Sequence, residues 1–165
     1  MKEISPKSID KNIIRMIADE WMLVTAGTRE GYNTMTASWG GMGEMWAKEV
    51  ALTVIRPQRY TFEFMEKHDI FTLSFFGDAY RKELGVCGSK SGRELDKAAA
   101  TGLTPVFEHG CTYFEQAKLV LVCKKLYVQD LRADCFTDKS LAETHYPNGD
   151  FHRVYVGEIV KVLTR

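Results

Sequence analysis

The sequence predicts a mainly β protein with inserted helices, arranged as a β-barrel of the Greek-key type. It contains at least six strand-like segments, and most of them are joined by short connections that favour antiparallel pairing. The helix-like segments are inserted between strands instead of alternating with them. No Gly-x-Gly-x-x-Gly follows a strand and no Gly-x-x-x-x-Gly-Lys-Ser occurs, so a doubly wound nucleotide-binding fold is disfavoured.

Length and composition limit the class of protein. The 165 residues predict one domain over 1–165, and the 22 basic and 22 acidic residues leave no net field that would attract nucleic acid or an anionic membrane. The first residues lack the apolar core of a signal peptide, and the longest aliphatic run, Leu119 to Cys123, is too short to span a bilayer. We therefore expect a cytoplasmic protein. The cysteine spacing predicts neither a disulfide framework nor a metal site.

The first half of the chain predicts a hairpin and a third strand. The segment 21–27 reads as a buried strand, 28–31 as a turn and 33–39 as the answering strand. A glycine-rich turn with exposed apolar residues follows. The β-branched segment 50–55 predicts the third strand, which ends at Arg56-Pro57.

Helix signals follow in the middle of the chain. Pro57 predicts a helix from its own position to about Lys67, because a proline in the first turn loses no hydrogen bond. After a strand over 70–76, Asp78 is expected to cap a helix that Gly85 ends. Ser91-Gly92-Arg93-Glu94 matches a capping box and predicts a helix over 92–100, with Gly102 just beyond it.

The last third of the chain returns to β structure. We expect a long strand over 116–127 and a final strand over 151–163. In the final strand Ile159 breaks the alternation set by Val154 and Val156, which predicts a bulge at Gly157-Glu158.

Two segments indicate a site for a polar ligand. The predicted strand 33–39 carries more hydroxyls than packing requires, and 87–93 combines small residues, hydroxyls and two cations before an expected helix N-terminus. Together they favour a phosphate ester with an aromatic head, whose phosphate would be held by hydroxyls and a cation. The residues expected to hold it are Thr36, Ser38, Ser89 and Lys90. Cys87 is either a small residue that allows close backbone approach or a thiol with a lowered pKa.

The order and spacing of several motifs resemble the flavin reductase-like family of FMN-binding split barrels, including the flavoredoxins. The motifs are Asn33-Thr34-Met35-Thr36-Ala37-Ser38-Trp39-Gly40-Gly41, Ile55-Arg56-Pro57-Gln58-Arg59-Tyr60, Phe71-Thr72-Leu73-Ser74-Phe75-Phe76, Cys87-Gly88-Ser89-Lys90-Ser91-Gly92-Arg93, Asp96-Lys97, Gly102-Leu103-Thr104-Pro105 and the segment from His152 to Ile159. The resemblance covers nearly the whole chain. It implies a homodimer that binds FMN near the subunit interface and transfers hydride or electrons.

With this resemblance, the expected flavin contacts are Asn33, Met35, Thr36, Ala37, Ser38, Trp39, Arg56, Arg59, Ser74, Phe75, Cys87, Ser89, Lys90 and Ser91. Backbone groups of Met35 to Trp39 and of Ser74-Phe75 would meet the edge of the flavin ring. His152, which matches the family's terminal histidine, would approach the ring or a nicotinamide.

Each of these residues also has a purely structural interpretation. Thr36 and Ser38 would face water from a half-exposed strand, and Ser91 would only cap a helix. Arg56 and Arg59 would be charges on a helix surface. Trp39 would be a core or dimer-interface residue, and His152 a histidine at a surface strand end.

Two classes of function remain open from the sequence. One is an enzyme, an NADH- or NADPH-dependent flavin reductase. The other is an FMN-binding electron carrier that is reduced by a protein partner. The Ser-Lys-Ser loop and the Asn-Thr-Met-Thr strand disfavour a third class, related to the pyridoxamine-phosphate oxidases.

Overall fold

One large antiparallel sheet organises the molecule. The computed structural model describes residues 1–165, and eight of its strands form a sheet in the order β3-β2-β6-β9-β10-β5-β4, with β1 added beside β10. The strands of this sheet are β1 (Lys2–Ile4), β2 (Met22–Thr28), β3 (Gly31–Ala37), β4 (Gly40–Met45), β5 (Lys48–Ile55), β6 (Ile70–Phe75), β9 (Leu119–Asp130) and β10 (Arg153–Thr164). A separate hairpin pairs β7 (Pro105–Glu108) with β8 (Cys111–Phe114).

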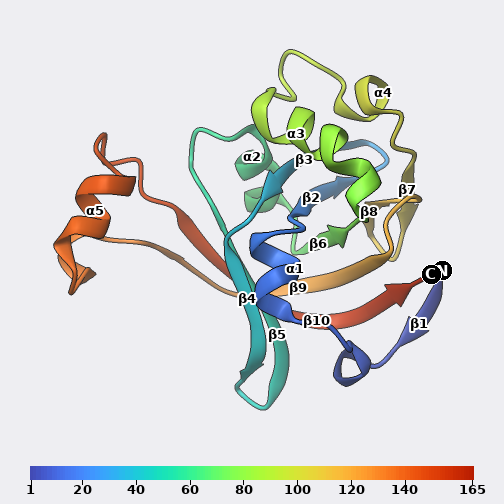
Figure 1. Cartoon of the computed structure of the whole chain (residues 1–165), viewed down its shortest axis with the longest axis horizontal. Coiled ribbons are helices and arrows are strands. Elements are labelled where there is room, and N and C mark those ends of the chain that lie inside the picture. Colours follow the sequence, from blue (N-terminus) through green and yellow to red (C-terminus); the bar gives the residue numbers. More distant parts are fainter.

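The sheet curves into an open barrel whose split lies between β3 and β4. These two strands follow each other in the chain and are joined only by Ser38 and Trp39, yet they occupy opposite ends of the strand order. Each therefore has one edge without a strand partner. The predicted mainly β split barrel with α insertions is confirmed (Figure 1).

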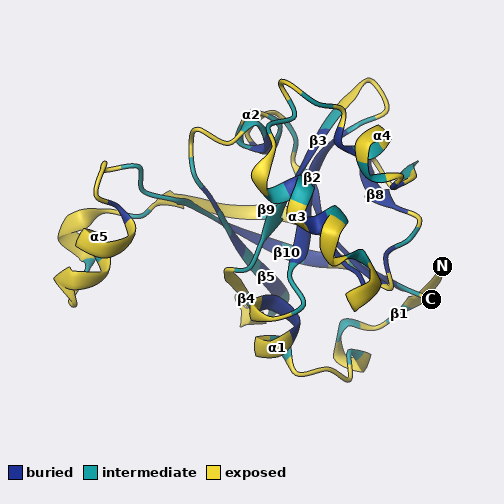
Figure 2. Cartoon of the chain, turned by 45° about the horizontal axis from the view of Figure 1, so that its top comes forward, coloured by how far each residue is buried: buried dark blue, intermediate teal, exposed yellow.

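Two apolar clusters fill the fold. The larger one occupies the barrel interior, where Phe71, Leu73, Phe75 and Tyr155 are at most 1% exposed. The smaller one joins the outer face of the sheet to the segment 76–122 and includes the buried Leu84. The strands of the barrel are largely buried, whereas most of the segment around α5 is exposed (Figure 2).

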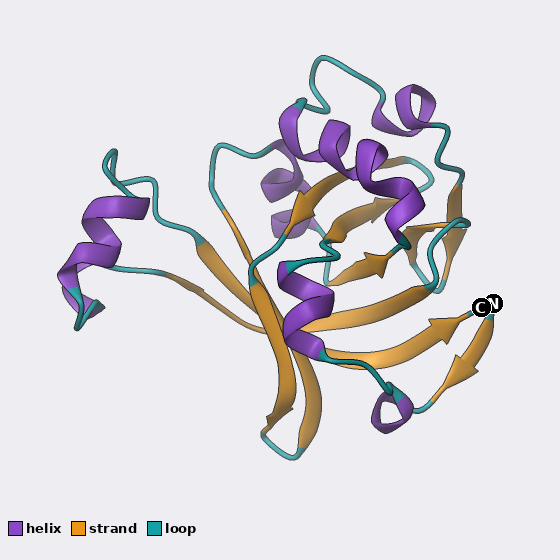
Figure 3. Cartoon of the chain, in the orientation of Figure 1, coloured by secondary structure: helices purple, strands orange, loops and turns teal.

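The helices are inserted between strands. They are α1 (Ile13–Ala18), α2 (Tyr60–Lys67), α3 (Arg81–Ser89), α4 (Lys97–Thr101) and α5 (Lys139–His145). Helices α2, α3 and α4 gather at one end of the barrel, and α5 stands apart at the tip of an arm between β9 and β10 (Figure 3). None of the five helices has the length and apolar character needed to cross a membrane.

Three helix boundaries differ from those expected. Helix α2 begins at Tyr60 and not at Pro57, because residues 57–59 form a turn. Asp78 starts a short 3-10 turn, and α3 runs through Gly85 to Ser89. No helix begins at Gly92: the Ser91 side chain accepts from the amide of Arg93, and the carboxylate of Asp96 caps α4 instead. Gly102 does follow α4, with a φ of 70°.

The structure contains four strands that the sequence does not predict, namely β1, β4, β7 and β8. Strand β4 contains three glycines, which predict a turn, but it pairs residue by residue with β5 from Gly40 opposite Thr53 to Met45 opposite Lys48. Its connection has positive φ at both central residues, as in the tight turns that suit hairpins. The bulge predicted at Gly157-Glu158 of β10 is wrong in its position. The register shift between Val156 and Gly157 leaves Leu126 of β9 as the extra residue, and the extra residue of β10 is Val160, between Ile159 opposite Cys123 and Lys161 opposite Val122.

Candidate functional site

Two adjoining cavities lie along β3 at the split of the barrel. The first, here called the cationic cavity, has a volume of about 380 Å³, and the second, the Trp39 cavity, about 270 Å³. They share Met35, Arg56 and Arg59. The cationic cavity is also lined by Asn33, Gln58, Tyr60, Thr61, Ser89, Lys90, Ser91, Gly92, Lys97 and Asp150, and the Trp39 cavity by Thr36, Ala37, Ser38, Trp39, Val54 and His152.

Strand β3 supplies one wall of both cavities. It is the terminal strand of the sheet and pairs only with β2, so the backbone groups along its other edge have no strand partner. An open strand edge of this kind offers N–H and C=O groups to a ligand. The side chain of Asn33 is fixed beside it, since Nδ2 donates to Thr61 Oγ1 at 2.7 Å.

The C-terminal end of α3 packs directly against β3. A Cβ on Gly88 would lie 3.2 Å from the Cβ of Thr36, so glycine permits the close approach. Thr36 Oγ1 donates to the carbonyl of Leu84 at 2.5 Å, and Arg59 Nη1 donates to the carbonyl of Gly88 at 3.1 Å. These contacts hold Ser89, Lys90 and Ser91 at the cationic cavity.

The cationic cavity is strongly positive in a protein without net charge. Four cations line it, Arg56, Arg59, Lys90 and Lys97, against one carboxylate, Asp150. That carboxylate is already paired with Arg56 and accepts a 2.8 Å hydrogen bond from Gln58, and these bonds hold its pKa below the ordinary value. Arg59, Lys90 and Lys97 have no carboxylate partner within the chain, so their positive charge suits an anion.

Lys97 is the most unusual of these cations. It is only 6% exposed, and its Nζ donates to the carbonyls of Thr34 at 2.8 Å and Cys87 at 2.7 Å. No carboxylate pairs with it, and burial lowers its pKa. Lysine is rarely this buried without a counter-ion. The sequence does not mark Lys97 as a site residue, because the Asp96-Lys97 pair carries no signal of its burial.

The Trp39 cavity is more apolar and carries His152 on one side. The rings of Trp39 and His152 lie 5.2 Å apart, and Nδ1 of His152 lies 2.8 Å from the hydroxyl of Tyr146. Burial, aided by the charge of Arg56, lowers the pKa of His152 to about 4. The imidazole is therefore neutral at physiological pH and carries a proton on only one nitrogen.

The structure brings most of the expected site residues together. Eleven of the fourteen expected flavin contacts line the two cavities, as does His152. The other three lie elsewhere: Ser74 and Phe75 are buried in β6, and Cys87 lies on the buried face of α3, where desolvation raises its pKa to about 11. Cys87 is thus a packed residue and not a reactive thiol. Lys90 lies at the C-terminal end of α3, and not before a helix N-terminus as the sequence suggested.

No group of three or more histidine, cysteine, aspartate or glutamate side chains is placed to hold a metal ion. The groups that the two cavities offer to a ligand are cations, hydroxyls, amides and aromatic rings.

Comparison with known proteins places this geometry in a family. The model of the flavin reductase like domain matches residues 14–165. Among solved structures, an FMN-binding protein from Thermus thermophilus with bound 1-cyclohex-2-enone has a TM-score of 0.69 at 22% identity, covering 99% of this chain and 80% of that one.

Two flavoredoxins are similar to a comparable degree. That of Desulfovibrio vulgaris has a TM-score of 0.68 at 23% identity, covering 98% of this chain and 77% of that one. That of Methanosarcina acetivorans has a TM-score of 0.68 at 16% identity, covering 100% of this chain and 75% of that one. The search of the curated proteins found no match.

Proposed function

The chain belongs to the flavin reductase-like family, and from that premise we propose that it is an FMN-binding oxidoreductase that accepts hydride from NADH or NADPH. One observation carries the proposal: a cavity with four cations and one paired carboxylate adjoins a more apolar cavity on the same strand edge. That arrangement matches a ligand with a phosphate at one end and a flat aromatic ring at the other.

Each part of FMN has residues that fit it. The phosphate fits the cationic cavity, where Arg59, Lys90 and Lys97 supply charge and the hydroxyls of Ser89 and Ser91 line the wall. The ring fits the Trp39 cavity, beside the free edge of β3 and the side chains of Met35 and Val54.

The protein's own contribution is positioning and electrostatics. Bound FMN supplies the hydride chemistry itself. His152 is neutral, so it orients a neighbouring group through a hydrogen bond and does not deliver a proton from an imidazolium. Tyr146 holds the ring of His152 in place, since burial raises the tyrosine pKa and keeps its hydroxyl protonated.

The first test is flavin binding. Calorimetric titration of the purified protein should show that FMN binds about tenfold or more tightly than riboflavin, because riboflavin lacks the charge-assisted bonds to the cationic cavity. Equal affinity for both would mean that the cationic cavity does not bind the phosphate, and absence of binding would reject the proposal.

The second test separates an enzyme from an electron carrier. FMN-loaded protein is mixed anaerobically with NADH, then with NADPH, and loss of flavin absorbance is followed by stopped flow. We expect bleaching within seconds that saturates with nucleotide. If neither nucleotide bleaches the flavin while dithionite does, the protein is an electron carrier reduced by another donor.

We also propose that two chains form a homodimer through the outer half of β9. Strand β6 pairs with β9 only as far as Lys124, and the amide of Lys125 still donates to the carbonyl of Asp69. The residues of β9 beyond Lys125 pair with β10 alone. An apolar patch, the outer β9 patch, covers this region and the neighbouring hairpin tip. It consists of Met45, Trp46, Leu126, Tyr127 and Val128, each at least 37% exposed. A second copy would cover both this patch and the open strand edge.

A further inference from the structure

The arm between β9 and β10, residues 131–152, reaches the Trp39 cavity as it returns to the barrel. Tyr146 is its only buried residue, at 7% exposed. Beside it the ring of His145 lies 5.3 Å from the ring of Trp39, and His152 at the end of the arm lines the Trp39 cavity. The returning part of the arm therefore shapes the end of the site that is proposed to hold the flavin ring.

Arg56 fastens this part of the arm to the barrel. It directly follows β5, and its Nη2 donates to the carbonyl of His145 at 2.8 Å while its Nη1 donates to the carboxylate of Asp150. The guanidinium also lies 5.0 Å from the centroid of the Tyr146 ring. A planar guanidinium with five donors makes these three contacts at once, whereas a lysine ammonium cannot. The charge and donors of Arg56 are thus used by the arm.

The hydroxyl of Tyr146 selects which nitrogen of His152 carries the proton. It lies 2.8 Å from Nδ1 of His152 and makes no other hydrogen bond. A buried hydroxyl proton needs an acceptor, so Tyr146 donates to Nδ1, and the proton of the neutral imidazole is left on Nε2. The Tyr146 ring stacks on Phe151 of the same arm with centroids 4.7 Å apart. The position of the hydroxyl therefore depends on where the arm is held.

We propose that Arg56 is a positioning residue for the flavin ring: it holds the arm so that Tyr146 keeps the His152 proton on Nε2, and this N–H donates to an acceptor atom on the edge of the ring. The inference rests on the proposed function, because it takes the Trp39 cavity as the site of the flavin ring. Arg56 acts through two other residues, so its replacement should affect binding of the ring and not of the phosphate.

Arg56→Lys is the main test variant. It retains the positive charge and can still pair with Asp150, but it lacks the planar fork that also reaches the His145 carbonyl. Tyr146→Phe is the second variant, and it removes only the hydroxyl while leaving the arginine contacts in place. Thermal melts verify that each variant folds.

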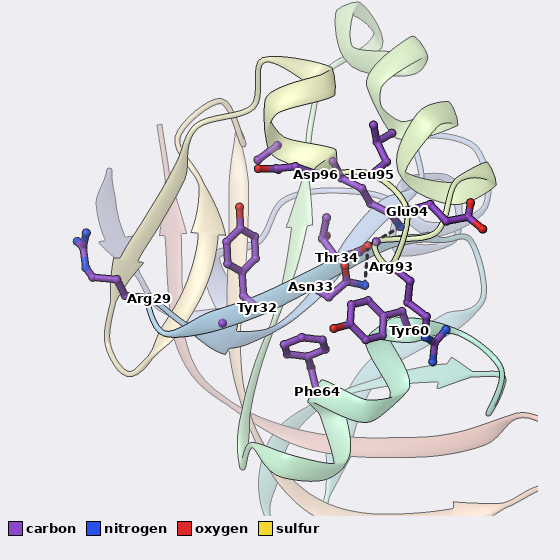
Figure 4. Close-up of a pocket in the computed structure, with 14 residues that line it drawn as sticks. Arg29, Tyr32, Asn33, Thr34, Tyr60, Phe64, Arg93, Glu94, Leu95 and Asp96 are labelled. Atoms are coloured by element: carbon purple, nitrogen blue, oxygen red, sulfur yellow. Dashed lines mark hydrogen bonds between the residues drawn. The ribbon is translucent and has the colours of Figure 1, made fainter.

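Arg93→Lys is the matched control for Arg56→Lys. Arg93 likewise pairs with a carboxylate, that of Glu63, and lies 4.6 Å from the centroid of a tyrosine ring, that of Tyr60 (Figure 4). None of its hydrogen bonds goes to the arm. Arg93→Lys therefore removes the same kind of contact without loosening the arm.

The first measurement is made on the apo protein. Long-range proton–nitrogen NMR spectra at mildly alkaline pH, with the His152 signals assigned from His152→Asn, should show a single tautomer protonated on Nε2 in the wild type. Arg56→Lys and Tyr146→Phe should each shift both ring nitrogens toward the averaged signals of a tautomer mixture. The double variant should shift them no further than either single variant, because both changes act on one hydrogen bond. Arg93→Lys should match the wild type.

The second measurement is the affinity of each variant for FMN and riboflavin, by calorimetric titration. Arg56→Lys and Tyr146→Phe should weaken both ligands by the same factor, about threefold to tenfold, because they weaken one hydrogen bond to the ring that the two ligands share. Arg93→Lys should change either affinity by less than about twofold.

Four outcomes would overturn this inference: a tautomer mixture in the wild type, the wild-type signal in Arg56→Lys, an equal shift in Arg93→Lys, or a loss in Arg56→Lys that is confined to FMN. The last would mean that Arg56 contacts the phosphate. In all four cases normal FMN binding by the wild type leaves the proposed function intact. If the wild type binds no FMN, the proposed function is rejected and this inference with it.

Discussion

Lys97 is the residue on which the proposed flavin site should depend most. Its ammonium lacks a carboxylate partner, so a bound phosphate would supply the missing counter-ion. We expect Lys97→Met to weaken FMN binding more than tenfold, because a charge-assisted bond is worth about 1.5–3 kcal/mol. The stability of the apo protein should change little, since an uncompensated buried charge is removed together with its bonds. Isothermal calorimetry and urea unfolding measure the two effects.

Lys90→Met is the matched control for Lys97→Met. Lys90 also lines the cationic cavity, but it is exposed at the C-terminal end of α3 and water screens its charge. Exposed ion pairs contribute about 0.2–1 kcal/mol, so FMN affinity should fall by no more than about fivefold. A larger loss for Lys90→Met than for Lys97→Met would show that the phosphate lies away from Lys97.

His152 should make the apo protein sensitive to mild acid. Its pKa is about 4 in the folded chain against an ordinary 6.5, so the unfolded chain binds more protons between these values. The free energy of unfolding should therefore fall as the pH drops from 6.5 to 4, by no more than about 3 kcal/mol after allowance for partial exposure. The groups that face the ring are Arg56, Arg59 and Asp150.

Urea unfolding at a series of pH values checks this behaviour. His152→Asn should lose the slope between pH 6.5 and 4, whereas His109→Asn should retain it. His109 lies in an exposed turn with a φ of 56°, a conformation that asparagine tolerates, so its replacement is a conservative control. Parallel curves for the wild type and His152→Asn would assign the acid sensitivity to other groups.

The residue types at the site were readable from the sequence, but their burial was not. Hydroxyls and cations near glycines indicate a phosphate site whichever way the chain folds, and most of these residues do line the cavities. Ser74 and Phe75 carry no pattern that separates an edge position from the central strand β6. The importance of Lys97 arises from packing between β3 and α3, which a local pattern does not contain.

At the level of elements, strands with β-branched or alternating residues were predictable, and helix boundaries were not. The hairpin β2–β3 and the strands β5, β6, β9 and β10 follow their sequence patterns closely. Cap residues were ambiguous, because Ser91 and Asp96 are both good N-caps, and only Asp96 precedes a segment that packs as a helix. Strand β4 is glycine-rich and forms because β5 lies beside it.

Alanine substitutions at Gly85, inside α3, and at Gly92, in the turn after α3, test where this helix ends. A Cβ on Gly92 would lie 1.9 Å from Asn33 Oδ1, so Gly92→Ala must push the turn away from β3. We expect a loss of about 1–3 kcal/mol in unfolding free energy and weaker FMN binding. Gly85 lies inside α3 with no atom within 4 Å of its Cβ position, so Gly85→Ala should stabilise the protein by about 0.5–1 kcal/mol.

Urea unfolding of the two variants measures both stability changes, and two outcomes would contradict the expectations. If Gly85 ended the helix in a left-handed conformation, as the sequence suggested, alanine there would destabilise the protein. If Gly92→Ala were neutral for both stability and FMN binding, the turn would not be held against Asn33.

At the scale of the whole molecule, one chain leaves part of its sheet uncovered. The second half of β9 is exposed on both faces, and Trp46 packs against Tyr127 with ring centroids 6.2 Å apart while remaining 57% exposed. Figure 1 shows the α5 arm extending from the barrel body on the side away from the termini, and the β4–β5 hairpin extending toward the bottom of the view. A second chain packed against the outer β9 patch would bury its exposed apolar residues.

We therefore expect light scattering coupled to size exclusion to give twice the chain mass of 18.8 kDa at low micromolar concentration. Tyr127→Lys places a charge in the outer β9 patch and should shift the protein to a monomer. Ile14→Lys makes the same kind of change at a residue that is 78% exposed on α1, outside the patch, and should leave the dimer intact. If the Tyr127→Lys monomer also loses FMN affinity while its melting temperature is retained, the partner chain completes the flavin site. If the wild type is already a monomer with FMN bound, the outer β9 patch has another role and the site belongs to one chain alone.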